Sequence, residues 1–251
     1  MYIQKIKLEN FRNYEKAEIE FDKNVNIIYG DNAQGKTNIL ESIFVCSLGK
    51  SFRTNKEKEL VNKEKNFTKV EMISKKEDRE VNIKCEINEK KKFYINDIFA
   101  KRTSEIIGKN YIVLFTPEDI EIINNEPARR RRFLNIMISQ LRPIYINLLS
   151  EYNKILDQRN IYLKQIKYEG KPIENLYIWD EQIAKIGQKI YQYRKEFIEK
   201  INDKIYNIHL KTTENKEKVK IEYFSNIRKK LFRKFEKKSK KWYTKRVYKH
   251  W

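Results

Sequence analysis

Cysteine and histidine are almost absent from this chain. Two of each occur in 251 residues, at Cys46, Cys85, His209 and His250, and no C-x-x-C pair is formed. Neither a disulfide framework nor a zinc site can be assembled from so few ligands, so the cysteines are expected to be core residues. No apolar stretch approaches the ~20 residues that span a bilayer, and no signal peptide is recognisable. The composition predicts a soluble cytoplasmic protein with no membrane span.

Positive charge is abundant but unevenly placed. The chain carries a formal net charge of +20. Residues 228–251 hold twelve Lys or Arg and one acid, so +11 lies there and +9 in the other 227 residues. A basic surface is one signature of nucleic-acid binding, but the abundant Lys, Ile, Asn and Tyr are also what A/T-rich codons supply. The location of the charge is therefore more informative than its total.

The amino-terminal part has the hydrophobic pattern of a sheet with an added helix. Alternation of apolar and polar residues is typical of half-buried strands, and short apolar runs are typical of strands buried on both faces. The runs 25–29 and 111–115 are of the second kind. From Thr37 onward apolar residues recur at helical spacing. The predicted strands are residues 17–21, 25–29, 81–87, 93–95 and 111–115.

Beyond Pro117 the hydrophobic period becomes helical. Pro127 suits the first turn of one helix, and Pro143 the start of the next. A turn is expected at 170–172, after which apolar residues recur every three or four positions over 183–205. Two long helices joined by a short turn predict an antiparallel hairpin. The expected organisation is an α/β lobe with a mixed sheet at 1–116, a helical lobe at 117–225 and a basic tail at 226–251.

One loop carries the strongest functional signal. Residues 30–37 match G-x-x-x-x-G-K-[ST] between a predicted strand and a predicted helix. The glycines permit backbone angles that turn N–H groups toward phosphate, and a helix start adds unpaired N–H groups. Lys36 would reach the β- and γ-phosphates of ATP and Thr37 would ligate Mg²⁺; a chance match in a glycine-rich turn is the alternative. The predicted ATP-binding residues of this loop are Gly30, Asp31, Asn32, Ala33, Gln34, Gly35, Lys36 and Thr37.

Five segments resemble the RecF family of bacterial DNA replication and repair proteins. They are "LENFRNYEKAEIEF" (8–21), "GDNAQGKTNILESI" (30–43), "GKSFR" (49–53), "FTPEDIEIINNEPARRRRFLN" (115–135) and "YNKILDQRN" (152–160). The resemblance implies an SMC-like ABC-type ATPase that binds ATP and forms an ATP-dependent homodimer on double-stranded, gapped or junction DNA. It also implies work with RecO and RecR, RecA loading at single-strand gaps, and a place in the SOS response.

The resemblance adds residues outside the loop. In SMC-like ATPases an arginine at the place of Arg12 reaches toward the bound phosphates, which implies that Arg12 and Asn13 contact the nucleotide. A surface arginine at a strand end is the alternative reading. Lys50 and Arg53 flank the aromatic Phe52 and suit contact with DNA phosphate, with a solvated loop as the alternative.

Four consecutive arginines, 129–132, fall at a predicted helix amino terminus, where the helix dipole disfavours positive charge. Neighbouring acids could compensate this charge, and so could DNA phosphate. The sequence leaves both open, and Arg129 and Arg130 join Lys50 and Arg53 as candidate DNA contacts. The neighbouring acids are Glu118, Asp119, Glu121 and Glu126.

The hydrolytic elements of an ABC-type site are not found after residue 117. The sequence contains no L-S-x-G signature, no apolar strand ending in paired acids, and no G-P-H-R-D element. We therefore expect ATP to act as a switch, with hydrolysis near background. The family pattern ends near 224–227, and the basic tail is expected to be an out-of-frame or replaced end. A purposeful nucleic-acid tail with Trp242, Tyr243 and Trp251 is the alternative.

Two rival functions are kept. A P-loop kinase acting on a small molecule would carry a substrate lid and a catalytic acid soon after the loop helix, and neither is evident. A non-functional fragment of a RecF-type protein would leave strands of the ATPase sheet unpaired and apolar surface exposed.

Overall fold

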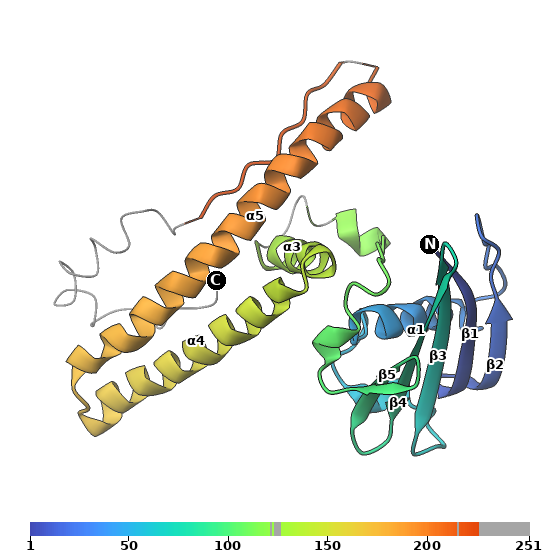
Figure 1. Ribbon diagram of the computed structural model, residues 1–251, viewed down its shortest axis with the longest axis horizontal. Helices are drawn as coiled ribbons and strands as arrows, with labels where there is room; N and C mark the ends of the chain where they lie inside the picture. Colours follow the sequence, from blue (N-terminus) through green and yellow to red (C-terminus); the bar gives the residue numbers. More distant parts are fainter. Residues whose placement is uncertain (121, 123–126, 215, 226–251) are drawn as a thin grey trace. The chain divides into compact units, whose positions relative to one another are not determined.

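The computed structural model describes residues 1–120, 122, 127–214 and 216–225 (Figure 1). The chain divides into two compact units, Met1–Ile120 and Glu121–Trp251. We call them the sheet unit and the helical unit. The boundary lies close to the one expected near residue 117. The predicted tail, 226–251, lies outside the described residues.

The sheet unit is built on six strands in the order β2-β1-β3-β4-β5-β6, and every neighbouring pair is antiparallel. The predicted strands at 17–21, 81–87 and 93–95 are confirmed in β2, β4 and β5. Residues 85 and 93 are paired directly, as are 83 and 95. The strands are β1 (Tyr2–Phe11), β2 (Tyr14–Glu20), β3 (Thr68–Lys76), β4 (Arg79–Ile87), β5 (Lys91–Ile95) and β6 (Ile98–Ala100).

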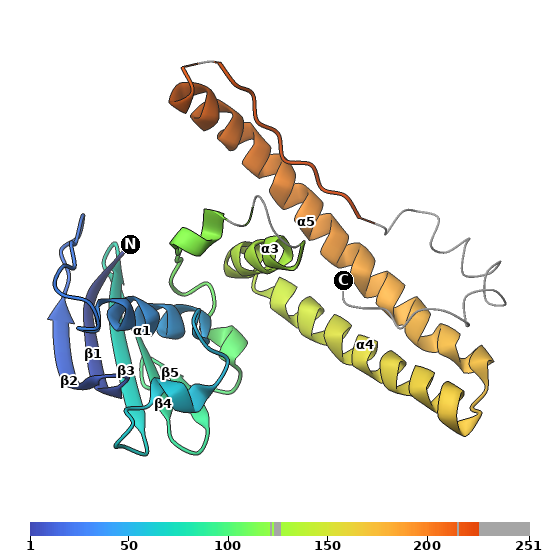
Figure 2. The same ribbon diagram turned by 180° about the vertical axis from the view of Figure 1, so that it is seen from behind.

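Helix α1 (Lys36–Leu48) lies across one face of this sheet (Figures 1 and 2). Its residues from Glu41 to Leu48 are all buried, so the helix is enclosed on every side over its second half. Gly49 ends it with φ +73, and its N–H donates to the carbonyl of Val45. The core beneath α1 is formed by Ile6, Leu8, Phe11, Ile39, Ile43, Val45, Cys46, Leu60, Val70, Met72, Ile83, Cys85, Ile87, Phe93, Ala100 and Ile106.

Two predicted strands are wrong. Residues 25–29 and 111–115 are not strands in the structure. They were expected to be buried on both faces, yet Ile27 and Val113 are 80% and 76% exposed. A strand requires a partner that completes its hydrogen bonds, and neither run is paired with another strand within the described residues. Apolar composition alone therefore overestimated the sheet.

The helical unit contains α3 (Pro127–Leu141), α4 (Ile144–Glu169) and α5 (Tyr177–Thr212). Helices α4 and α5 form the predicted hairpin, and Gly170 ends α4 with φ +67 (Figure 1). Near the turn, Arg159 pairs with Asp180 at 2.5 Å. The core of this unit is formed by Ile138, Tyr145, Ile155, Ile186 and Ile190, with partly buried neighbours around them.

Short 3-10 helices connect these elements. They are η1 (Glu57–Leu60), η2 (Thr103–Glu105), η3 (Pro117–Ile120) and η4 (Ile173–Leu176). Among the described residues, no helix combines the length and the apolar character needed to cross a membrane.

Candidate nucleotide-binding site

The glycine loop, residues 30–37, leads directly into α1. Gly30, Ala33 and Gly35 have φ angles of +139, +66 and +97, so three left-handed residues bend the loop over a short distance. Gly35 is the N-cap of α1 and its carbonyl accepts the N–H groups of Asn38 and Ile39. The sequence therefore forms the helix start that the motif predicted.

The amides of the loop are available to an anion. Within the described part of the chain, no hydrogen bond uses the backbone N–H groups of residues 32–37. Those of Lys36 and Thr37 belong to the first turn of α1, where a helix leaves its N–H groups unpaired and carries partial positive charge. The Thr37 side chain is exposed at the same helix start.

The Lys36 side chain folds back over the loop. Its Nζ donates to the carbonyl oxygens of Gly30 and Asp31, at 2.6 Å each. Both acceptors are neutral, so the ammonium group has no carboxylate partner within the described residues. A cation held only by carbonyl dipoles binds a phosphate oxygen more strongly when one becomes available.

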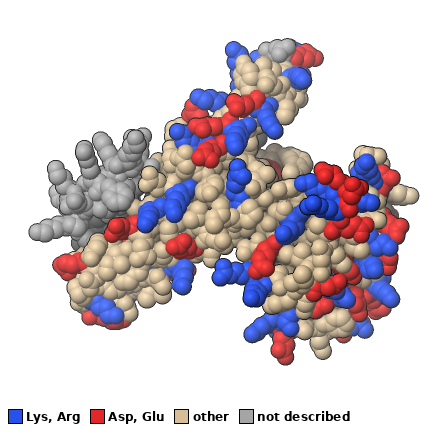
Figure 3. All heavy atoms as spheres, in the orientation of Figure 1, with Lys and Arg blue, Asp and Glu red and all other residues tan. Residues whose placement is uncertain are grey.

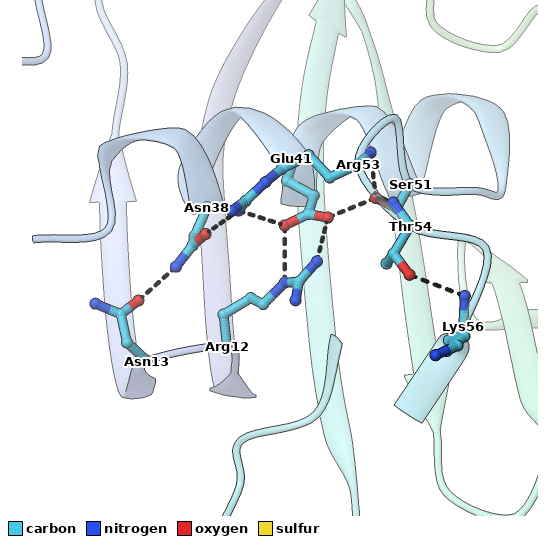
Figure 4. Close-up of polar contacts among 8 residues, drawn as sticks. All are labelled: Arg12, Asn13, Asn38, Glu41, Ser51, Arg53, Thr54 and Lys56. Carbon is cyan, nitrogen blue, oxygen red and sulfur yellow. Dashed lines mark hydrogen bonds and ion pairs between the residues drawn. The ribbon is translucent and has the colours of Figure 1, made fainter. Parts of the chain in front are cut away.

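A buried carboxylate lies on α1, the helix that follows the glycine loop (Figure 4). Glu41 has no solvent exposure. Its Oε2 accepts from Arg12 Nε at 2.9 Å and its Oε1 from Arg12 Nη2 at 2.7 Å. Ser51 Oγ donates to Oε1 at 2.5 Å, and Arg53 Nη1 lies 3.4 Å from Oε2. We call Arg12, Asn38, Glu41, Ser51 and Arg53 the Glu41 cluster.

Arg12 is placed by its backbone as well as by this ion pair. It lies in the two-residue turn between β1 and β2, with φ +54, an angle that side chains other than glycine rarely adopt. Its N–H donates to the carbonyl of Leu60. The bonds to Glu41 use Nε and Nη2, and Nη1 makes no hydrogen bond within the described residues. Nε and Nη2 of the Arg12 guanidinium are thus bound to Glu41, and Nη1 is available to another acceptor.

The β1–β2 turn also contacts the glycine loop. A Cβ placed on Gly35 would lie 2.9 Å from the Asn13 amide group and 2.8 Å from the Tyr14 hydroxyl. Asn13 Oδ1 accepts from Asn38 Nδ2 at 2.7 Å (Figure 4). The structure therefore places Asn13 beside Gly35 and Arg12 on Glu41 of α1. Contact of either residue with a nucleotide stays a prediction.

The candidate DNA contacts fall in both units. Lys50 is exposed, whereas the Arg53 guanidinium is bound to Asn38 at 2.8 Å and to Glu41. Arg129 and Arg130 are exposed on α3, and Arg130 Nη1 donates to the Ile122 carbonyl at 3.2 Å. On the face seen in Figure 3, basic and acidic side chains alternate over the sheet unit and along α5. A role in DNA binding stays a prediction for all four residues.

Compensation of the arginines at 129–132 is only partly described. Asp119 accepts from the N–H and hydroxyl of Thr116, so its carboxylate serves a local turn. The Glu118 side chain and residues 121 and 126 lie outside the description, and the two alternatives for this charge stay open.

Glu41, Asn38 and Ser51 were not predicted as site residues. Glu41 had a detectable signal: it is the one acid of α1, in a stretch whose other residues, from Ile39 to Leu48, are apolar or serine. A charge at a core position of a helix is costly unless it is paired, and that cost could have directed attention to Arg12. The pairing spans 29 positions in sequence, so local patterns do not show it.

The fold is that of a P-loop ABC-type ATPase lobe with a helical lobe attached. Residues 2–114 match the family model described as the RecF/RecN/SMC N-terminal domain. Two solved structures described as the recombination mediator protein RecF in the RecFOR pathway superimpose on this chain. The one described as RecF-ATPrS has a TM-score of 0.88, 36% identity, and coverage of 95% of this chain and 67% of that one. The one described as RecF-ATP has a TM-score of 0.84, 38% identity, and coverage of 94% and 66%.

Sequence relatives give the same result. The DNA replication and repair protein RecF of Clostridium acetobutylicum is 44% identical over 230 residues, which are 91% of this chain and 63% of the relative. That of Clostridium kluyveri is 42% identical over 249 residues, 96% of this chain and 68% of the relative. The chain belongs to the RecF family. It spans between 62% and 68% of the length of the first relatives it matches.

Proposed function

We propose that this chain is the ATP-binding, DNA-associating part of a RecF-type replication and repair protein. The observation that carries the proposal is the glycine loop at the start of α1, with Lys36 over it, in a chain of the RecF family. Solved relatives are described as RecF with ATP, which supports the same ligand here. DNA, RecO and RecR as partners, and an ATP-dependent homodimer, are carried over from the family.

The residues present fit a nucleoside triphosphate. Six successive amides of the glycine loop, residues 32–37, are unused within the described chain, and oriented amides of this kind bind phosphate oxygens. Lys36 would exchange its two carbonyl acceptors for phosphate oxygens. Thr37 would contribute its hydroxyl to a Mg²⁺ ion held mainly by the nucleotide.

Arg12 would add a second cation. Its Nη1 is the nitrogen that Glu41 does not hold, so a phosphate oxygen could bind there while the ion pair is kept. A guanidinium fixed in this way loses little conformational entropy when it binds an anion. We propose Asn13 as a contact of the loop or the nucleotide from the same turn.

Equilibrium dialysis with Mg²⁺ and labelled ATP tests the proposal. The chain is expected to retain ATP, and Lys36→Ala is expected to lower the affinity at least about tenfold because a charge-assisted contact is lost. The exposed Lys63→Ala is the control and is expected to bind as the unchanged chain does. Folded protein that retains no ATP would refute the proposal.

DNA binding separates this function from that of a small-molecule kinase. Affinity for duplex or gapped DNA is expected to fall steeply with salt, with a slope of about −0.9 per phosphate contacted. Substituting Lys50, Arg53, Arg129 and Arg130 one at a time with alanine identifies which of them contribute. A chain that binds ATP but shows no salt-dependent DNA affinity would favour the kinase.

ATP turnover is expected near background, because the sequence contains neither the signature segment nor the paired acids that position the attacking water. Phosphate release measured with and without DNA checks this. Robust turnover that Lys36→Ala abolishes would contradict the expectation.

A further inference from the structure

Glu41 poses an energetic question. It is a charged side chain with no solvent exposure, in the middle of α1. Burying a carboxylate costs several kcal/mol unless partners satisfy it, and an apolar residue would usually be at least as stable there. The arrangement therefore calls for a role beyond packing.

The partners of Glu41 come from two segments. Arg12 belongs to the β1–β2 turn, which contacts Gly35 of the glycine loop. Ser51 and Arg53 belong to the segment that follows α1. One carboxylate thus joins the residue expected to meet phosphate to residues 50–56, the segment that carries two of the candidate DNA contacts (Figure 4).

The two arginines are held unequally. Arg12 makes two bonds to Glu41, at 2.7 and 2.9 Å, whereas Arg53 makes one contact of 3.4 Å. Arg53 is also held by Asn38 Oδ1 at 2.8 Å, and Asn38 in turn donates to Asn13. A second path of hydrogen bonds therefore runs from residue 53 to the turn beside the glycine loop.

We propose that Glu41 is a positioning residue that couples nucleotide binding to the 50–56 segment. It aims Arg12 at the phosphates, and any pull of a phosphate on Arg12 changes how firmly the shared carboxylate holds Arg53 and Ser51. Ser51 transmits the change, because its hydroxyl also accepts the backbone N–H groups of Arg53 and Thr54. The inference rests on the proposed ATP binding.

A double-mutant cycle tests the first half of the inference. Equilibrium dialysis with Mg²⁺ and ATP is carried out on the full chain and on Glu41→Gln, Arg12→Ala and the double variant. Each single change is expected to weaken ATP about tenfold. The double variant is expected to be no weaker than Arg12→Ala, because Glu41 acts through that residue. Ser42→Ala is the control: this neighbouring buried hydroxyl donates to the Ile39 carbonyl and touches neither arginine.

Amide hydrogen exchange over residues 50–56 tests the second half. ATP is expected to change the exchange of this segment at least about twofold in the unchanged chain and in Ser42→Ala, but not in Glu41→Gln. If Glu41→Gln does not fold, Ser51→Ala serves instead, since it removes one donor without leaving an arginine unpaired. That variant is expected to bind ATP and to lose most of the exchange response.

The outcomes separate the two levels of the argument. A chain that binds no ATP overturns both the proposed function and this inference. A chain that binds ATP while Glu41→Gln binds equally well, or while exchange over 50–56 stays unchanged, overturns the inference alone. Additive losses in the cycle would likewise show that Glu41 serves stability and does not act through Arg12.

Discussion

Gly30 and Gly35 of the glycine loop lie in different surroundings. Both have left-handed backbone angles, which cost an alanine about 1–2 kcal/mol. A Cβ on Gly30 meets nothing within 4 Å, whereas one on Gly35 lies under 3 Å from Asn13 and Tyr14. We expect Gly30→Ala to lower the free energy of unfolding by about 1 kcal/mol and Gly35→Ala by about twice that. Urea denaturation measures both, and equal losses would show that the contact with the β1–β2 turn is not constraining.

The two cysteines report on the sheet unit. Burial raises the pKa of both thiols, to about 12 for Cys85, and only a thiolate reacts rapidly. Alkylation in native buffer is expected to be at least about a hundredfold slower than in urea. Rapid labelling of the native chain would mean that the core opens.

Because burial raises the pKa of Cys85, it also makes the free energy of unfolding depend on pH. The pKa of Cys85 is higher in the folded chain than its ordinary value of 9.0. Above pH 9 the unfolded chain therefore binds fewer protons, so the free energy of unfolding should fall between pH 9 and about 12. Urea titrations at pH 8 and pH 10 measure it, and Cys85→Ala should reduce the difference while the contribution of Cys46 remains.

At the scale of single residues, local spacing was sufficient to predict the helix start at the glycine loop, because the whole motif lies within eight positions. Nucleotide contact by its residues stays a prediction. The partners of Glu41 could not be predicted from local sequence patterns. They depend on a turn between two strands and on a loop after a helix, and only the packed sheet unit brings these segments together.

Among the helices, Arg194 of α5 holds three elements together. It donates to Tyr145 Oη at 2.9 Å and to Asn135 Oδ1 at 3.0 Å, and Tyr145 donates to the same Asn135 oxygen. These residues lie on α5, α4 and α3. No carboxylate pairs with Arg194 among the described residues, so neutral oxygens alone satisfy a largely enclosed guanidinium.

Arg194→Ala is expected to lower the free energy of unfolding of the helical unit by about 2–3 kcal/mol, because a charged donor of several hydrogen bonds is lost. Lys195→Ala, which removes an exposed neighbour, is the control and should change it by less than about 0.5 kcal/mol. Thermal melting followed by circular dichroism compares the two. Equal melting temperatures would show that Arg194 is not a structural element of this unit.

Secondary-structure elements whose sequence patterns involve at most one neighbouring element were predicted well. The strand β2, the pair β4–β5 and the helical hairpin follow from alternation or from heptad-like spacing, and each is paired within its own part of the chain. The strands β1, β3 and β6 were not among the predicted ranges, and the runs 25–29 and 111–115 were over-predicted. Apolar composition indicates that a segment favours burial, but it does not show whether a partner strand is present.

Those two runs have a consequence for the molecule as a whole. Residues at alternate positions of the two runs, among them Tyr29, Val113 and Phe115, are 57–88% exposed in the sheet unit. Apolar surface of this kind promotes association. We expect the chain to form larger species at about 10 μM and above, as the fragment hypothesis also requires.

Analytical ultracentrifugation over a concentration series measures this association. The double change Ile27→Lys and Val113→Lys is expected to shift the distribution toward monomer. The double change Tyr168→Lys and Tyr177→Lys, at exposed positions of the helical unit, adds the same charge and serves as control. Equal effects of the two pairs would assign the association to net charge and not to the exposed runs.

The ammonium group of Lys36 donates hydrogen bonds to the carbonyl oxygens of Gly30 and Asp31, so a side chain of the glycine loop itself holds the loop in its curved conformation. When an anion binds, Lys36 Nζ would exchange these carbonyl oxygens for oxygens of the anion, and the backbone of the loop would not have to refold. The dissociation rate of a bound anion should therefore depend on how well the anion competes with the two peptide carbonyl groups for Lys36, and very little on motion of the backbone.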